Sequence, residues 1–184
     1  MTRLSPRDWG LVGAVAALAL DQLSKGWILY GLGLFQPPGA PAGAPHKEID
    51  LTPFFNLIMV WNPGVSYGLF PAHGPLGSAI LALFSLAAVI GLGWWLWHAH
   101  SSALAVGLGL VIGGALGNLV DRLIYGQVAD FFHFYIHGYH WYVFNIADCA
   151  ITFGVAALLY DALLRPEHHA SAQPRGNPGA TDVE

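Results

Sequence analysis

The chain has little charge. Only 10% of its 184 residues are Asp, Glu, Lys or Arg, against about 25% in a typical soluble domain. Hydrophobic residues make up 55%, and the mean hydropathy is +0.52. This composition excludes an ordinary soluble fold and predicts one integral membrane domain with no large soluble module. The net charge of -4 offers no basic footprint for nucleic acid.

Cysteine is almost absent as well. Because Cys149 is the single cysteine, the chain cannot form an internal disulfide or a cysteine-based metal site. We expect no metal and no cofactor. One alternative is open, since His133, His137 and His140 have a spacing that could bind zinc, with Asp130 as a fourth ligand. The glycine and the aromatic residues among them argue against the regular helix that this site would need.

Four apolar segments are long enough to cross a membrane, at about residues 9–30, 74–97, 103–125 and 145–164. A hydrocarbon core roughly 30 Å thick requires about 20 residues of helix. We predict a four-span membrane domain over residues 1–165. Residues 166–184 contain Pro, Gly, Ser and Ala without an apolar pattern, which predicts a disordered cytoplasmic tail.

A cleaved signal peptide is the alternative for the first segment. Arg3 and Arg7 could form its basic region, and Ala17-Leu18-Ala19 resembles a cleavage site. The apolar run continues past that site to Tyr30, and cleavage would leave three spans. We therefore favour a retained first span.

The basic residues that flank the spans predict the orientation. Arg3 and Arg7 precede the first span, and Arg165 and Arg175 follow the fourth. In the connectors between spans one and two and between spans three and four, Lys47 is the single Lys or Arg. Because Lys and Arg favour the cytoplasmic side, both termini are predicted to be cytoplasmic. This topology would gather every polar group within the spans at the outer interface. The residues concerned are Asp21, Lys25, Asn118, Asp121, Arg122 and Asp148.

The two outer connectors differ in character. Residues 36–45 are rich in Pro and Gly, whereas residues 48–61 contain many strand-forming residues and end at the turn signal Asn62-Pro63-Gly64. Residues 126–143 are aromatic and rich in histidine, as expected of a segment that lies in the membrane interface.

Two aspartates, Asp130 and Asp148, flank the end of the second outer connector. A carboxylate beside hydrocarbon costs several kcal/mol unless it is paired, solvated or protonated, which makes it a candidate functional residue. Two close carboxylates can share one proton, so that one activates water and the other acts as an acid in amide hydrolysis. The alternative is that Asp130 is an exposed connector residue and Asp148 caps the fourth helix. A shared site requires the two carboxyls to lie within one water molecule of each other.

Other polar residues are candidates for supporting such a site. Asp21 and Lys25 have the i, i+4 spacing of a helical ion pair. Asp121 and Arg122 suggest a second pair, in which Arg122 holds a carboxylate or a carbonyl. Gly64 in its turn would allow close backbone approach to a ligand.

Four blocks of sequence carry a family resemblance. They are Asp21-Gln22-Leu23-Ser24-Lys25, Asn62-Pro63-Gly64-Val65-Ser66-Tyr67-Gly68, the run from Gly114 to Phe131 that contains Asn118-Leu119-Val120-Asp121-Arg122 and Val128-Ala129-Asp130, and Phe144-Asn145-Ile146-Ala147-Asp148. In these blocks the chain resembles lipoprotein signal peptidase (signal peptidase II), the aspartic protease of bacterial inner membranes. The resemblance covers about residues 9–164. Ser66-Tyr67 and the Pro/Gly/Ala-rich stretch before residue 46 depart from the family's pattern.

The resemblance implies a mainly α, integral membrane fold, with a four-transmembrane-helix bundle, a small extracytoplasmic β-sheet cradle and an interfacial helix. The strand-prone residues 48–61 and the aromatic connector suit the last two elements. It implies that Asp130 and Asp148 are the catalytic dyad of an endopeptidase. Residues that line or brace the site would be Asp21, Lys25, Asn62, Gly64, Asn118, Arg122 and Asn145.

The resemblance also implies a substrate, a diacylglyceryl-modified prolipoprotein that is cut on the N-terminal side of the lipidated cysteine. The enzyme would act as a monomer at the outer face of the bacterial inner membrane, in contact with membrane lipid. A hypothesis from another class is a small transporter or lipid-binding protein that uses the same polar cluster as a proton relay.

Overall fold

The computed structural model describes residues 4–40, 47–64 and 74–164. Four helices in this part of the chain are long and apolar enough to cross a membrane, as the sequence predicted. They are α1 (Pro6–Gly26, continued by the π-helical turn η1, Trp27–Gly31), α2 (Gly74–Trp97), α3 (Ser102–Tyr125) and α4 (Ile146–Leu164). The tail at residues 166–184, residues 41–45 of the Pro/Gly/Ala-rich stretch, and Ser66-Tyr67 lie outside the described residues.

Helix α3 is the centre of the bundle and packs against α1, α2 and α4. Its glycines permit this close approach. A Cβ on Gly109 would overlap the carbonyl oxygen of Gly10 in α1, and one on Gly114 would overlap the carbonyl oxygen of Ala147 in α4. Small residues at such positions let helix backbones meet within a membrane. Many large apolar side chains of α2, among them Leu83, face outward, whereas Leu96 is buried in the core of the bundle.

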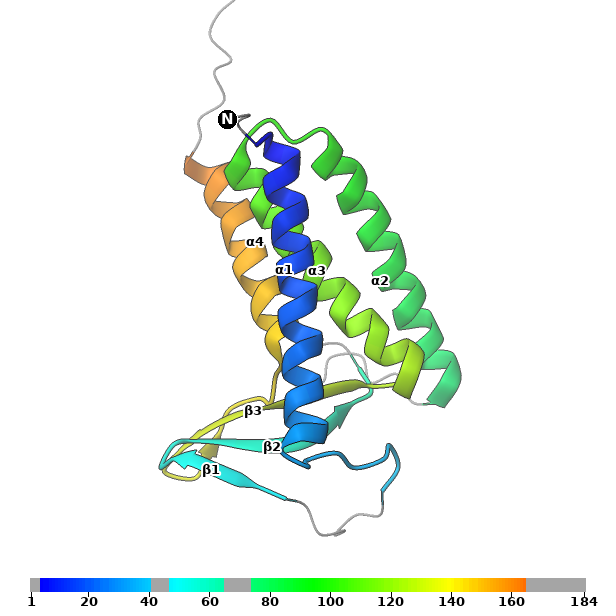
Figure 1. Ribbon diagram of the computed structural model, residues 1–184, viewed down its shortest axis with the longest axis vertical. Helices are drawn as coiled ribbons and strands as arrows, with labels where there is room; N and C mark the ends of the chain where they lie inside the picture. The colour runs from blue at the N-terminus through cyan, green and yellow to red at the C-terminus, as the bar shows by residue number, and fades with distance from the viewer. Residues whose placement is uncertain (1–3, 41–46, 65–73, 165–184) are drawn as a thin grey trace, which may run out of the picture.

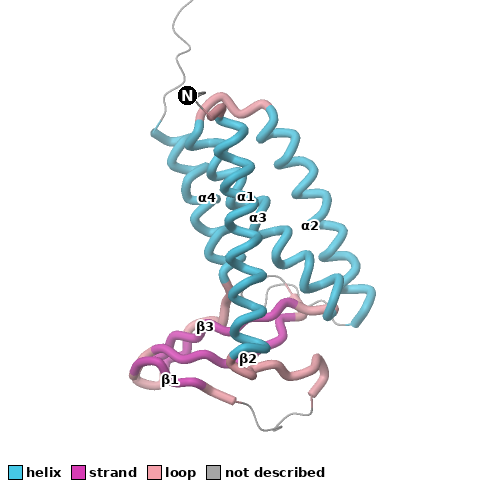
Figure 2. The backbone as a smooth tube through the Cα atoms, viewed as in Figure 1, coloured by secondary structure: helices cyan, strands magenta, loops and turns pink. Residues whose placement is uncertain are grey.

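A four-stranded antiparallel sheet lies at the end of the bundle away from the N-terminus (Figures 1 and 2). Its order is β1 (Ile49–Thr52), β2 (Phe55–Asn62), β3 (Val128–Ile136), β4 (Tyr139–His140). The predicted strand region at residues 48–61 is therefore confirmed as a hairpin. A buried cluster of Ile28, Leu34, Leu57 and Phe131 joins the sheet to the end of α1.

The aromatic connector differs from its prediction. Residues 126–143 were expected to suit an interfacial helix, but most of this segment forms β3 and β4. The reason is a partner distant in sequence. Strand β2 pairs with β3 from Phe55 opposite Phe134 to Asn62 opposite Val128, and such pairing favours the extended form of aromatic residues.

The expectation that every polar group of the spans lies at one interface is wrong. Asp161, near the far end of α4, accepts a hydrogen bond of 3.3 Å from Ser101 at the start of α3. This pair lies at the end of the bundle opposite the sheet, where α4 finishes near the start of α1 (Figure 1). The polar groups of the spans are therefore not confined to one interface.

Candidate active site

Asp130 is buried in β3, opposite Val60 of β2, and is 1% exposed. Its Oδ1 accepts a hydrogen bond of 2.7 Å from Asn145 Nδ2, and its Oδ2 accepts one of 3.0 Å from Asn62 Nδ2. Burial, with a further contribution from the charge of Asp148, raises the pKa of Asp130 well above its usual value. This burial excludes the alternative considered from sequence, in which Asp130 is an exposed residue of the connector.

Asp148 is only half-buried, in the first turn of α4. It forms a reciprocal capping arrangement with Asn145. The backbone N–H of Asp148 donates to Asn145 Oδ1 at 3.0 Å, and the N–H of Asn145 donates to Asp148 Oδ2 at 3.4 Å. The alternative role as a helix cap is thus partly right. The other carboxylate oxygen accepts a 3.1 Å hydrogen bond from Asn118 Nδ2, so Asp148 also belongs to a network beyond its own helix.

Asn145 connects the two aspartates. It is fully buried, and besides its bonds to Asp130 and Asp148 its Nδ2 lies 3.1 Å from Asn118 Oδ1 and 3.2 Å from the carbonyl oxygen of Ala129. Two amides and two carboxylates from β3, α3 and the start of α4 therefore form one hydrogen-bonded network. The expectation that the two carboxyls lie within one water molecule of each other stays a prediction.

A buried ionic cluster lies beside this network. Lys25 Nζ is 2.8 Å from Asp21 Oδ2 and 2.8 Å from Asp121 Oδ2, and all three side chains are at most 5% exposed. The predicted Asp21–Lys25 pair is confirmed. Asp121, which the sequence suggested as a partner of Arg122, is instead a third member of this cluster.

The cluster also holds the backbone next to each aspartate. Asp21 Oδ1 accepts a 2.9 Å hydrogen bond from the N–H of Ala147, and Asp121 Oδ2 accepts a 3.0 Å bond from the N–H of Ala129. Each alanine directly precedes one aspartate of the pair. Through these bonds α1 and α3 set the positions of β3 and α4 at the site.

Gln22 was missed by the sequence argument. Its Nε2 donates to Asp21 Oδ2 at 3.0 Å and to the carbonyl oxygen of Gly117 at 3.2 Å. It therefore joins the cluster to α3. Its signals in the sequence are its place next to Asp21 and its membership of the first block that carries the family resemblance.

Arg122 holds the turn after β2. Its Nη2 donates to the carbonyl oxygen of Gly64 at 2.9 Å, and its Nη1 donates to that of Asn118 at 3.3 Å. The sequence suggested that Arg122 holds either a carboxylate or a carbonyl, and these two hydrogen bonds go to backbone carbonyls. The N–H of Gly64 donates to Asn62 Oδ1 at 3.0 Å, which leaves the amide nitrogen of Asn62 facing Asp130.

The histidines do not gather as a zinc site would require. His133 Nδ1 pairs with Asn56 Oδ1 at 2.9 Å, and its Nε2 pairs with His140 Nδ1 at 3.2 Å, so both ring nitrogens have other polar partners. Within residues 4–40, 47–64 and 74–164, no three His, Cys, Asp or Glu side chains are grouped to hold a metal ion. Burial, with the neighbouring His140, lowers the pKa of His133 and favours its neutral form.

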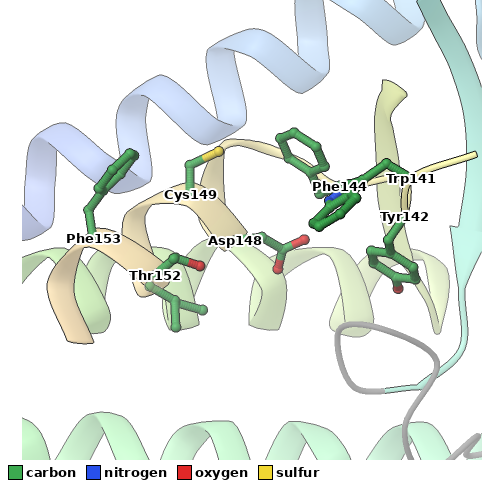
Figure 3. A pocket seen from close by; sticks show the side chains of 8 residues that line it. Trp141, Tyr142, Phe144, Asp148, Cys149, Thr152 and Phe153 are labelled. Carbon is green, nitrogen blue, oxygen red and sulfur yellow. The ribbon is translucent and has the colours of Figure 1, made fainter. Parts of the chain in front are cut away.

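Two cavities adjoin the aspartates. One, of about 310 Å³, is lined by Asp148, by Phe144 and by Cys149, Thr152 and Phe153 along α4 (Figure 3). The other, of about 530 Å³, opens beside Asp130, Asn62 and His133. Trp141 and Tyr142 line both cavities. Both linings are mainly apolar, so the site can accept an extended, mainly apolar ligand that runs past the two aspartates.

Comparison with known proteins decides the family. A model of the family described as signal peptidase (SPase) II matches residues 13–164. The chain belongs to the signal peptidase II family. The matched range contains all the predicted site residues, and membership makes the chain a peptidase.

Similar proteins agree with this membership. A lipoprotein signal peptidase of Rhodopseudomonas palustris (strain TIE-1) is 46% identical over 165 residues, which cover 88% of this chain and 95% of that protein. One of Methylorubrum extorquens (strain PA1) is 47% identical over 170 residues, covering 92% and 94%. A solved bacterial membrane enzyme, determined by the in meso method at 2.3 Å resolution, superposes with a TM-score of 0.67 at 25% identity, covering 88% of this chain and 94% of that one.

The signal peptidase II resemblance that the sequence suggested is thus confirmed. So is the mainly helical membrane fold with its small antiparallel sheet. With four spanning helices and bacterial relatives, this peptidase is a multi-pass membrane protein rather than a soluble hydrolase.

Proposed function

We propose that the chain is an aspartic endopeptidase that cleaves diacylglyceryl-modified prolipoproteins on the N-terminal side of the lipidated cysteine. Asp130 and Asp148 are its catalytic pair. The observation that carries this proposal is the position of Asn145, which hydrogen-bonds to both carboxylates at once. The side-chain amide of Asn145 holds Asp130 and its backbone N–H holds Asp148, and an aspartate pair held by one buried residue is suited to share a proton across a bound substrate.

The different surroundings of the two carboxyls support separate roles. Asp130 is almost fully buried, and burial raises its pKa well above the usual value, which favours its protonated form. Asp148 is half-buried and lines a cavity, so its carboxylate lies where a substrate and the attacking water would meet it. Asp130 is therefore the first acid and Asp148 the base.

The reaction then balances without a cofactor. Asp148 takes a proton from water as the water oxygen attacks the scissile carbonyl carbon, and Asp130 gives its proton to the carbonyl oxygen. The C–N bond of the tetrahedral intermediate breaks as Asp148 returns its proton to the leaving amine. Asp130 recovers a proton from a hydroxyl of the intermediate. The products are the signal peptide with a new carboxyl end and the lipidated cysteine with a free amine.

The sheet end of the bundle is the proposed outer face. Arg3, Arg7, Arg165 and Arg175 flank the opposite ends of the spans, which favours cytoplasmic termini in a bacterial inner membrane. The network then lies at the depth where the lipidated cysteine of a membrane-anchored substrate would meet water. We propose that the enzyme acts as a monomer whose own α3, β3 and α4 residues supply the network.

The test uses a synthetic prolipoprotein peptide with a diacylglyceryl cysteine, incubated with the full-length enzyme in detergent and analysed by mass spectrometry. Asp130→Asn and Asp148→Asn should each reduce cleavage by at least about 10²-fold, the lower range for loss of a general acid or base. Asp50→Asn, at an exposed aspartate of β1, is the matched control and should cleave normally.

Two further arms separate the alternatives. The same peptide with an unmodified cysteine should not be cut, and a chelator should leave cleavage unchanged if histidine-bound zinc plays no part. Retained cleavage in either Asp130→Asn or Asp148→Asn, with normal folding, would contradict the dyad.

A further inference from the structure

Tyr142 stands where the two cavities meet. It belongs to the segment between β4 and α4 and lines the cavity beside Asp148 as well as the cavity beside Asp130. Figure 3 shows Tyr142 and Asp148 among the side chains that line the first of these cavities, with the ring of Trp141 between them in this view. A substrate that occupies both cavities therefore passes this side chain at the aspartates.

The hydroxyl of Tyr142 shares a donor with Asp130. Asn62 Nδ2 donates one hydrogen to the Tyr142 oxygen and one to Asp130 Oδ2, and Asn62 Oδ1 is held by the N–H of Gly64. The Asn62 amide is thus fixed at both ends. Because the phenolic oxygen accepts from Asn62, the hydroxyl of Tyr142 acts as an acceptor in this contact, and its O–H can donate only to a group other than Asn62.

The geometry allows one substrate atom to reach both groups. The Tyr142 oxygen and Asp130 Oδ2 each lie within 3.0 Å of the same nitrogen, so they are separated by no more than about 6 Å. A single oxygen atom between them can hydrogen-bond to both at an ordinary distance. In the proposed reaction such an atom is the scissile carbonyl oxygen, which Asp130 protonates.

We propose that Tyr142 is a further catalytic residue, whose O–H donates a hydrogen bond to the scissile carbonyl oxygen as it becomes tetrahedral. This inference rests on the proposed function. A fixed neutral donor aimed at developing negative charge stabilises the transition state more than the bound substrate. Tyr142 transfers no proton, so the balance of the reaction is unchanged.

The test is Tyr142→Phe in the full-length enzyme, with kcat and KM measured separately on the diacylglyceryl peptide. We expect kcat to fall about 10²-fold with KM within about twofold of wild type, as for loss of one oxyanion donor. Tyr139→Phe is the matched control, because Tyr139 loses the same hydroxyl from an exposed position in the same connector.

A second measurement distinguishes contact with the intermediate from support of Asn62. A lipidated peptide whose scissile amide is replaced by a secondary alcohol mimics the tetrahedral carbon. Its inhibition constant should rise in Tyr142→Phe by a factor close to the fall in kcat, while a reduced-amide peptide without that oxygen should bind as before. If both inhibitors weaken equally, or if kcat stays within threefold of the Tyr139→Phe value, the proposal is wrong. Failure of the dyad would instead appear as cleavage by Asp130→Asn or Asp148→Asn.

Discussion

Replacing Lys25 with methionine tests how the buried ionic cluster supports the site. The side chains have similar length, so the change removes the charge and leaves most of the volume. Lys25 Nζ lies 2.8 Å from a carboxylate oxygen of both Asp21 and Asp121, and its side chain is 5% exposed. Without it, two buried carboxylates face each other with no cation between them.

The expected loss follows from this geometry. Removing one partner of a buried ion pair costs about 3–5 kcal/mol, mostly because the remaining charge is left uncompensated. For a chain of this size about 1 kcal/mol corresponds to about 2–4 °C in Tm, so we expect Tm to fall by about 6–20 °C. Cleavage should fall as well, because Asp21 and Asp121 hold the N–H groups of Ala147 and Ala129.

Cys149 makes the assay direct. It is the single cysteine and is partly buried, so the reaction of its thiol with a fluorophore speeds up on unfolding. This reports unfolding in detergent without an introduced cysteine. Lys47→Met is the matched control, since Lys47 is an exposed lysine that should cost at most about 1 kcal/mol. A Tm for Lys25→Met no lower than that of Lys47→Met would refute the argument that the cluster is an energetically coupled unit.

Two further predictions concern helix packing and pH. Gly114→Ala should destabilise by about 1–3 kcal/mol and reduce cleavage, because its methyl group would push against the carbonyl oxygen of Ala147 at the start of α4. Gly91→Ala, in α2 with open space around it, is the control in the same fluorophore assay; equal Tm values for the two variants would contradict close packing at α4. The raised pKa of Asp130 means that the folded state holds this proton more tightly than the unfolded state, so its contribution to stability is complete below about pH 4 and is lost as the pH rises through the folded pKa. The Tm of Asp130→Asn relative to wild type should therefore increase from pH 4 to pH 8, and a difference that does not change with pH would show that Asp130 is already ionised at low pH.

The strands show where sequence reasoning was sufficient and where it was not. Residues 48–61 were predicted as strands because strand-forming residues are bounded there by turn signals, and β1 and β2 occupy that region. Residues 126–143 have an aromatic composition that suits a membrane interface equally well. Only the pairing with β2, more than 60 residues earlier in the chain, selects the strand form.

The support of the site was predicted unevenly for a similar reason. The Asp21–Lys25 pair follows from helical spacing alone. Asp121 joins it from α3, about 100 residues away, and its sequence neighbour Arg122 points instead to the turn at Gly64. Tyr142 had no signal, because an aromatic residue in an interfacial connector is ordinary until its hydroxyl is seen beside Asn62.

The sequence by itself determined the number and length of the spans, since the thickness of hydrocarbon requires about 20 apolar residues for each crossing. It also singled out Asp130 and Asp148, since carboxylates are costly near lipid. The tertiary structure alone decided that one residue, Asn145, joins the two through its side-chain amide and its backbone N–H, and that an ionic cluster from α1 and α3 holds the backbone before each. Hydrogen bonds form only within a few tenths of an ångström of their ideal length, and segments far apart in the chain reach that accuracy only when the whole bundle is packed.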